Sequence, residues 1–372
     1  MKVSIITVLN TVNYGSALQT FATQRFFEKM GIEIEFVDYW RKDQTTNARI
    51  HRIITDKKKT LKQWVKKPLR DILEIKSIKK SEDIFRKFIV EKIHLTPKTY
   101  FSYEELVKDC PQADVYATGS DQMWNSGWNQ GIEKSFFLEY APENKKRIAF
   151  ATSIGKTHFE KEEADEIIPL IKKYDLVTLR EKSAVDLLKE YDIDGQLVLD
   201  PTLTLTKEDW FKILPSNKRT KPYLLVYQLH MSHNNADFTK AVKEIAARKG
   251  LEIVRVAYSY SDRKVGERVV LPGVFEFLSL IRGAGFIVTD SFHGTAFSIN
   301  FNKQFAVIYP EFFGTRMDNI LRLTNLQSRR YQSNDSIDKW DTEIVYDEAN
   351  RILEERRARV EDVFKKYFEV TN

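Results

Sequence analysis

Short apolar runs alternate with longer segments of helical spacing along most of the chain. Runs of about four to eight β-branched and aromatic residues predict strands, and apolar residues three and four apart predict the helices between them. The predicted strands are 3–9, 32–39, 114–118, 147–153, 176–179, 223–229, 251–257, 286–288 and 305–308. Helices are predicted at 160–173, 207–214, 236–249, 275–282 and 343–368, and others begin near residues 16 and 294. This alternation is typical of α/β proteins with parallel sheets.

The alternation occurs twice, on either side of a segment at about 200–222 that we interpret as a domain linker. The predicted fold is therefore α/β, with two facing Rossmann-like domains in the GT-B-type architecture. The first domain spans 1–200 and contains a basic helical excursion at about 41–110. The second spans 222–335, and a charged helix within 343–372 is expected to pack back on the first domain.

The excursion has a local excess of about ten positive charges. Residues 41–87 contain sixteen Lys or Arg against six Asp or Glu, and apolar residues keep helical spacing among them. One interpretation is a helix with a solvated basic face. The other is a peripheral contact with the inner membrane surface, because basic amphipathic helices adsorb to anionic lipid. No nucleic-acid recognition motif accompanies the charge, so no nucleic-acid partner is expected.

The bulk composition is that of a soluble globular protein. The 372 residues suffice for two domains with substantial cores, and 42% are hydrophobic and 30% charged. The net charge is +6 and the mean hydropathy −0.42. A single cysteine, Cys110, excludes an internal disulfide and fits a reducing compartment. Neither a signal peptide nor an apolar run long enough to span a membrane occurs, which predicts a cytoplasmic protein.

Polar turns follow several predicted strands, and they contain the candidate chemistry. In open α/β sheets ligands bind at the carboxyl ends of the strands, where helix N-termini attract anions. His293 lies in such a turn, DSFHG. Arg180 ends another strand, where it would grip a carboxylate or phosphate, or pair with Glu181 or another surface acid. In the first turn, Gly15 permits a tight bend and Ser16 is placed to cap the helix. No metal is expected, because His230 and His233 form an isolated HxxH.

These turns resemble a known family. TDSFHGTAFSINFNKQFAVI, GSDQMWN, NYGSALQ, LREKSA and LDPTLTL closely resemble elements of the polysaccharide pyruvyl transferase family, over roughly residues 4–331. The resemblance implies transfer of an enolpyruvyl unit from phosphoenolpyruvate to a sugar, which then closes into a cyclic ketal. The acceptor would be a sugar or lipid-linked oligosaccharide, a precursor of exopolysaccharide or capsule. Phosphoenolpyruvate would be a substrate, and no cofactor is expected.

The resemblance also assigns roles to residues. His293 would protonate the enol methylene or hold the departing phosphate, and Asp121 would take the proton from the attacking hydroxyl. The donor-binding residues in the second domain and at strand ends would be Arg180, Arg316, Ser291, Gly294 and Thr295. The acceptor or cleft loops of the first domain would contribute Asn13, Tyr14, Gly15, Ser16, Gln122, Trp124, Asn125 and Ser153.

Two other functions remain open from the sequence. A nucleotide-sugar glycosyltransferase of polysaccharide synthesis would have the same GT-B-type build, because fold does not fix function. A non-catalytic carbohydrate-binding relative is the other alternative, although it need not keep His293, Arg180 and Asp121 together. The acceptor sugar stays undetermined among galactose, glucose and N-acetylmannosamine, as does the choice between a 4,6- and a 3,4-ketal.

Overall fold

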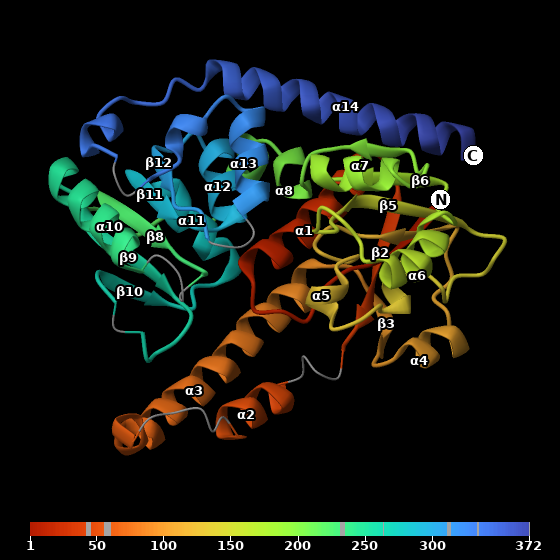
Figure 1. Ribbon diagram of the computed structural model, residues 1–372, viewed down its shortest axis with the longest axis horizontal. Helices are drawn as coiled ribbons and strands as arrows, with labels where there is room; N and C mark the ends of the chain where they lie inside the picture. Colours follow the sequence, from red (N-terminus) through yellow and green to blue (C-terminus); the bar gives the residue numbers. More distant parts are fainter. Residues whose placement is uncertain are drawn as a thin grey trace. The chain divides into compact units, whose positions relative to one another are not determined.

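A computed structural model describes residues 1–41, 46–55, 61–230, 235–262, 264–310, 314–332 and 335–371 (Figure 1). The chain divides into two compact units. Unit 1 comprises Met1–Thr45, Phe88–Leu205 and Glu354–Asn372, and unit 2 comprises Thr46–Lys87 and Thr206–Leu353. Across the part of the chain that the structure describes, we find no helix with the length and apolarity needed to cross a bilayer.

Unit 1 is built on a parallel sheet of seven strands in the order β3-β2-β1-β4-β5-β6-β7. The strands are β1 (Lys2–Ile6), β2 (Glu33–Tyr39), β3 (Leu95–Tyr100), β4 (Val115–Thr118), β5 (Lys146–Thr152), β6 (Leu176–Leu179) and β7 (Gly195–Leu197). The order is that of a doubly wound sheet, in which successive strands are added on one side of β1 and then, from β4 onward, on the other. We call this topological switch point between β1 and β4 the chain reversal. Ligands of such sheets bind at the carboxyl ends of the two strands flanking the reversal.

The helices of unit 1 cover this sheet. They are α1 (Tyr14–Lys29), α4 (Tyr103–Lys108), α5 (Ser126–Asn129), η2 (Lys134–Phe137), α6 (Lys161–Ile171), α7 (Lys182–Lys189), α8 (Pro201–Thr204) and the C-terminal part of α14 (Asp347–Thr371). The fully buried ring of Phe364 on α14 lies 5.8 Å from Phe26 on α1 and 5.1 Å from Phe150 on β5. The last helix is therefore anchored to the core of unit 1 by aromatic contacts.

Unit 2 repeats the plan with a five-stranded parallel sheet in the order β10-β9-β8-β11-β12. Its strands are β8 (Tyr223–Tyr227), β9 (Glu252–Ala257), β10 (Glu267–Val270), β11 (Phe286–Thr289) and β12 (Phe305–Val307). Its other elements are α2 (Thr46–Thr55), most of α3 (Leu61–Lys92), α9 (Lys207–Ile213), α10 (Asn235–Lys249), α11 (Val274–Gly283), α12 (Phe292–Asn300), α13 (Gly314–Leu323), η3 (Gln327–Arg329) and η4 (Ile337–Trp340). The reversal falls between β8 and β11.

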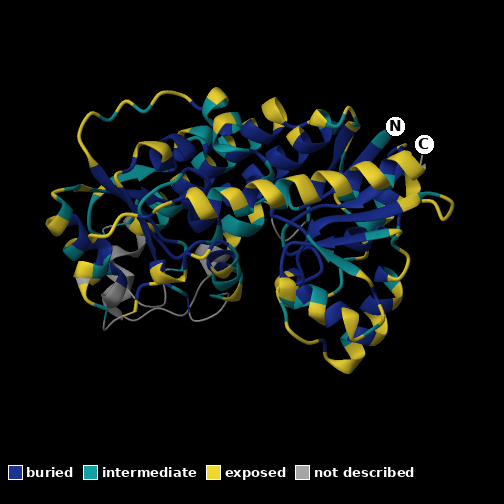
Figure 2. Ribbon diagram, turned by 90° about the horizontal axis from the view of Figure 1, so that it is seen from above, coloured by how far each residue is buried: buried dark blue, intermediate teal, exposed yellow. Residues whose placement is uncertain are grey.

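The prediction of an α/β fold with two Rossmann-like domains of GT-B type is confirmed. Figure 2 shows the central strands of each sheet as buried and the outward faces of the helices as exposed. Three strands, β3, β7 and β10, were not predicted; all three lie at sheet edges, where one side of the strand has no partner. The final helix begins at Asp347, four residues after the expected start at 343.

The basic excursion differs from its predicted placement in the first domain. Residues Thr46–Lys87 group with unit 2, because α3 bonds to the turn after β9 and the end of β10. Ser77 accepts a hydrogen bond from the Tyr260 N–H at 3.0 Å, and Lys80 donates to the Val270 carbonyl at 2.7 Å. Residues 42–45 and 56–60 of the excursion lie outside the described residues, so the hypothesis of membrane contact stays a prediction.

Candidate functional site

Asp121 lies at the carboxyl end of β4, at the chain reversal of unit 1. Its Oδ2 accepts a hydrogen bond from the Ser16 hydroxyl at 2.5 Å, and its Oδ1 lies 3.4 Å from a guanidinium nitrogen of Arg180. The backbone of Asp121 has φ 89°, a left-handed conformation that residues with a side chain seldom adopt. Such strain persists only where surrounding contacts enforce it, and it occurs often at functional sites. The carboxylate is thus held in one orientation by α1 and by the end of β6.

Arg180 is buried beneath Asp121, with its side chain only 1% exposed. Its Nη1 donates to Asp200 at 2.9 Å and to the Ser120 hydroxyl at 3.1 Å. Burial by itself would lower the pKa of this guanidinium, but the charges of Asp200 and Asp121 raise the pKa above its ordinary value. The geometry therefore favours a role in positioning Asp121. The predicted alternative partner, Glu181, has other partners in hydrogen bonds.

Glu181 holds the loop after β5 and was not predicted as a site residue. Its carboxylate accepts hydrogen bonds from the Ser153 hydroxyl at 2.9 Å and from the backbone N–H groups of Ile154 and Gly155 at 3.0 and 2.7 Å. Ser153 in turn donates its N–H to the Asp121 carbonyl at 3.0 Å. The predicted residue Ser153 therefore connects Glu181 to the Asp121 loop.

The other predicted residues of unit 1 mainly build these loops. Asn13, not Ser16, caps α1, accepting from the Gly15 N–H at 2.8 Å, so the expected cap at Ser16 is wrong. Gln122 and Asn125 are buried and bond to each other at 2.6 Å. Tyr14 is fully buried.

Trp124 was predicted to lie in the acceptor or cleft loop, but the structure places its side chain in the core. Its side chain is fully buried, stacks on Phe137 with the ring centroids 5.9 Å apart, and donates its indole N–H to the Phe136 carbonyl at 3.2 Å. A ring covered on both sides cannot stack on a sugar. Sequence alone gave no signal that would separate a core tryptophan from an exposed one in this motif.

Asp290 marks the chain reversal of unit 2 and was also missed. Its carboxylate accepts from the backbone N–H groups of Leu229 at 2.6 Å and His230 at 3.0 Å, which ties the end of β11 to the loop after β8. Burial raises the pKa of Asp290 above its ordinary value, against the opposing effect of these two hydrogen bonds. The polar run that follows an apolar strand was the available signal.

His293 follows Asp290 within the first turn of α12. The Ser291 hydroxyl caps this helix, accepting from the Gly294 N–H at 3.3 Å, and the Thr295 hydroxyl donates to the Ser291 carbonyl at 2.9 Å. The imidazole is 6% exposed, and its ring lies 5.1 Å from that of Phe292. Of the predicted donor residues in unit 2, Ser291, Gly294 and Thr295 thus form the helix start that carries His293.

Gly294 lets α12 approach the sheet closely. A Cβ at this position would lie 2.3 Å from the Thr289 hydroxyl oxygen and 2.9 Å from a ring carbon of Tyr227. We expect Gly294→Ala to displace the helix and destabilise unit 2 by about 1–3 kcal/mol, the usual cost of overpacking. Thermal unfolding measures this, with Gly273→Ala as the control because the nearest atom to its Cβ is 3.8 Å away. Equal melting temperatures of the two variants would contradict the prediction.

Arg316, on α13, lies beside the same turn. Its guanidinium carbon is 5.8 Å from the centroid of the Phe292 ring, within the range of a cation–π contact. Asp318, the alternative partner considered for it, pairs with Arg322 at 2.5 Å and accepts from the Tyr309 hydroxyl at 3.3 Å. The preceding residues 311–313 lie outside the described part of the chain, as does His233.

Two further cations that the sequence analysis missed lie near the carboxyl edge of the unit 2 sheet. Arg255, 1% exposed on β9, and Lys264 both donate to the amide oxygen of Gln228, at 3.2 and 3.3 Å. Burial lowers the pKa of each, and for Lys264 the nearby charge of Arg255 lowers it further. An arginine inside the otherwise apolar strand EIVRVA was the signal for this pair. Arg255 is buried and Lys264 only partly so, and the carboxylates of Asp262 and Asp290 oppose the positive charge of both.

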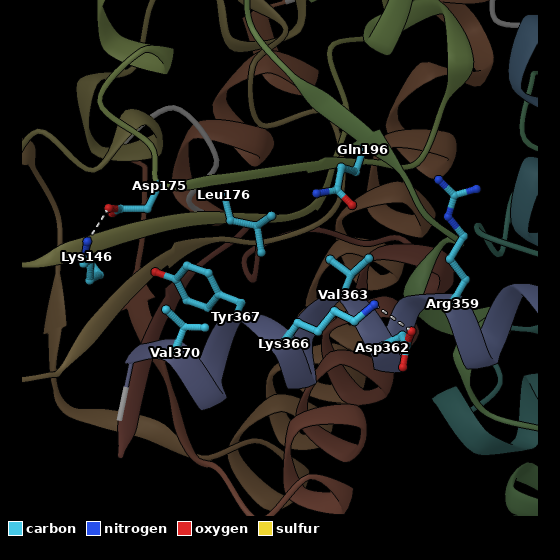
Figure 3. Close-up of a pocket in the computed structure, with 10 residues that line it drawn as sticks. All are labelled: Lys146, Asp175, Leu176, Gln196, Arg359, Asp362, Val363, Lys366, Tyr367 and Val370. Atoms are coloured by element: carbon cyan, nitrogen blue, oxygen red, sulfur yellow. Dashed lines mark hydrogen bonds and ion pairs between the residues drawn. The ribbon is translucent and has the colours of Figure 1, made fainter.

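The cavity in Figure 3 lies away from the candidate residues at the carboxyl edges of the sheets. This cavity of about 850 Å³ is lined by Lys146, Asp175 and Leu176 at the amino ends of β5 and β6, by Gln196, and by residues of α14. It therefore lies at the opposite edge of the sheet from Asp121. Within the ranges that the structure describes, no three His, Cys, Asp or Glu side chains are grouped to hold a metal ion.

The fold and these two strand-end sites define an α/β protein of GT-B type with polar sites at both chain reversals. A model of the polysaccharide pyruvyl transferase family matches residues 13–311, which is most of the chain. The protein belongs to this family, whose members are transferases. The recognition made from the sequence motifs is confirmed. No curated protein matches the chain at a significant level.

Solved structures support the fold alone. Staphylococcus aureus MnaA in complex with UDP has 11% identity and a TM-score of 0.52, with 99% of this chain and 96% of that chain covered. The UDP-GlcNAc 2-epimerase of Methanocaldococcus jannaschii has 13% identity and a TM-score of 0.50, with 92% and 91% covered. At such identities the likeness carries no information about substrates.

Proposed function

We propose that this pyruvyl transferase moves an enolpyruvyl unit from phosphoenolpyruvate to a sugar of a polysaccharide precursor and closes it into a cyclic ketal. The observation that carries the proposal is that the family motifs fall at the two chain reversals. His293 follows the reversal strand of unit 2, and Asp121 follows that of unit 1, held by Ser16 and Arg180. A lipid-linked acceptor and a peripheral membrane contact belong to the same proposal.

The reaction requires one acid and one base. His293 donates a proton to the methylene carbon of the donor, which becomes a methyl group and leaves C2 electrophilic. A sugar hydroxyl adds to C2 and gives its proton to Asp121, and the C2–O bond to phosphate breaks with its electron pair on phosphate. A second sugar hydroxyl then bonds to C2 and closes the ketal. The two sugar hydroxyls release two protons. One restores the proton that His293 donated, and the other is carried away by the departing phosphate.

Cations of unit 2 support donor binding there, where Asp262 and Asp290 also lie near Arg255 and Lys264. Phosphoenolpyruvate carries a phosphate and a carboxylate, and Lys264 and Arg255 together with Arg316 offer three cations at the carboxyl edge and the adjoining α13. Arginine pairs with phosphate or carboxylate through two parallel hydrogen bonds, and a lysine adds a point charge. We therefore assign donor binding to unit 2 and the activation of the acceptor hydroxyl to Asp121 of unit 1.

We expect phosphoenolpyruvate to raise the melting temperature of the purified protein. A ligand at about one hundred times its dissociation constant stabilises the folded state by about 2.7 kcal/mol. Lys264→Gln should remove most of this shift, because it deletes a cation next to Arg255. The control is Lys221→Gln, an equal charge change at an exposed lysine that pairs with Glu252 at the amino end of β9. A melting-temperature shift in Lys264→Gln as large as that of the wild type would show that Lys264 does not bind the donor.

The alternative is a nucleotide-sugar glycosyltransferase of polysaccharide synthesis. The same measurement with a panel of nucleotide sugars separates the two functions. A shift with a nucleotide sugar and none with phosphoenolpyruvate would replace the pyruvyl transfer proposal with this one.

A further inference from the structure

A second cavity lies at the carboxyl edge of the unit 1 sheet, on the same edge as Asp121. It has a volume of about 610 Å³, within the usual range of small-molecule sites. Its lining comes from the segments after β2 and β3 and from the loop after β4, around residues 132–134. The motifs that define the family do not include these residues, and no role has been given to them above.

The lining combines aromatic rings with charged side chains. Phe101 is 42% exposed although it is a large apolar side chain, and Tyr103 adds a partly exposed ring, whereas Tyr39 is buried. The backbone at Phe101 is fixed, because its N–H donates to the Glu105 carboxylate at 2.8 Å and Ser102 caps α4. An apolar ring that is held at the surface beside polar groups offers a stacking face to a ligand.

The charges of this cavity balance. Two cations, Arg41 and Lys134, line it together with two carboxylates, Glu104 and Glu133. A phosphate or a nucleotide would need an excess of cations, which this cavity lacks. Mixed donors and acceptors around aromatic rings instead suit a neutral molecule with many hydroxyls and apolar C–H faces. A pyranose ring has these properties.

The cavity is rigidly connected to the Asp121 loop. Arg41 donates to the side-chain oxygen and to the carbonyl of Asn129, both at 2.9 Å. Asn129 donates its side-chain N–H to the carbonyl of Met123 at 2.9 Å, two residues after Asp121. One wall of the cavity and the candidate base therefore belong to one hydrogen-bonded loop.

We propose that this cavity binds a neutral pyranose ring of the acceptor, with Phe101 as its stacking face and Arg41 and Glu133 as hydrogen-bonding partners. The proposal rests on the proposed function in naming the sugar as the acceptor. Binding of a sugar at this cavity does not itself require pyruvyl transfer.

Saturation-transfer NMR tests the proposal with the methyl pyranosides of galactose, glucose and N-acetylmannosamine, in the absence of phosphoenolpyruvate. We expect at least one of them to bind the wild type, and Phe101→Ala to weaken that binding about tenfold. The control is Val107→Ala on α4, since Val107 is 52% exposed and does not line the cavity. Glu133→Gln keeps the shape of the side chain and should also weaken binding.

The outcomes separate this proposal from the proposed function. Unchanged binding in both Phe101→Ala and Glu133→Gln, or no saturation transfer to any sugar by the wild type, overturns the sugar site. Loss of sugar binding in Phe101→Ala without any melting shift by phosphoenolpyruvate supports the sugar site and refutes the donor. Melting curves of the variants without ligand check that Phe101→Ala and Glu133→Gln remain folded.

Discussion

Arg180→Met is expected to destabilise unit 1 by about 3–5 kcal/mol, the cost of removing one partner from a buried ion pair. The guanidinium is 1% exposed and is bonded to Asp200, whose side chain is also 1% exposed. Without it, the carboxylates of Asp200 and Asp121 would lie close together with no cation between them. Urea unfolding measures the loss as a lower midpoint.

Two further variants separate the buried pair from a general effect of the substitution. Arg180→Met combined with Asp200→Asn should cost less than the sum of the two single changes, because no charge is left buried. The Asp200 carboxylate accepts a hydrogen bond from the Thr202 N–H at 3.0 Å, and the side-chain oxygen of asparagine can still accept it. Arg351→Met, which breaks an exposed pair with Glu348, should leave the midpoint almost unchanged. An unchanged midpoint in Arg180→Met would refute the structural role.

This expectation changes how loss of activity at Arg180 should be interpreted. An inactive Arg180 variant would suggest donor binding, as the resemblance to the family implies. In the structure the same result would follow from a displaced Asp121, because Arg180 is among the groups that hold this carboxylate, together with Ser16 and the Gln122 N–H. A donor role at Arg180 therefore needs a direct binding measurement on a variant that remains folded.

The sequence predicted the central strands well and the edge strands poorly. Strand 176–179 was predicted with the bounds that β6 has in the structure, because both faces of a central parallel strand are buried and give a continuous apolar run. In contrast, β3 reads LTPKTY, and its proline and the lysine after it are both exposed, which an edge strand tolerates. The short edge strands β7 and β10 contain no buried residue and give no continuous apolar run, so they were missed as well.

The sequence predicted which loops form the candidate site, but not which buried residues hold those loops in place. The polar residues after β4 and β11 could be recognised because parallel strands place such turns at one edge of the sheet. The pairing of Arg180 with Asp200 depends on how β6 and the start of α8 meet in space, and the spacing of residues does not determine that contact. The same holds for Glu181, Asp290 and the burial of Trp124.

His293→Gln is expected to lower the rate of pyruvyl transfer by about 10²–10⁴-fold, the usual contribution of a general acid. Glutamine can donate a hydrogen bond to phosphate but cannot transfer a proton at neutral pH. His293 is 6% exposed in the first turn of α12, so a side chain of similar polarity should leave the fold intact. His158→Gln, at an exposed histidine of unit 1, is the control and should keep the wild-type rate.

The two roles considered for His293 give different results in this variant. If the imidazole is the acid, phosphoenolpyruvate should still raise the melting temperature of His293→Gln while turnover is lost. If His293 instead binds the departing phosphate, the melting shift should shrink together with the rate. A variant that keeps a substantial part of the rate would exclude both roles.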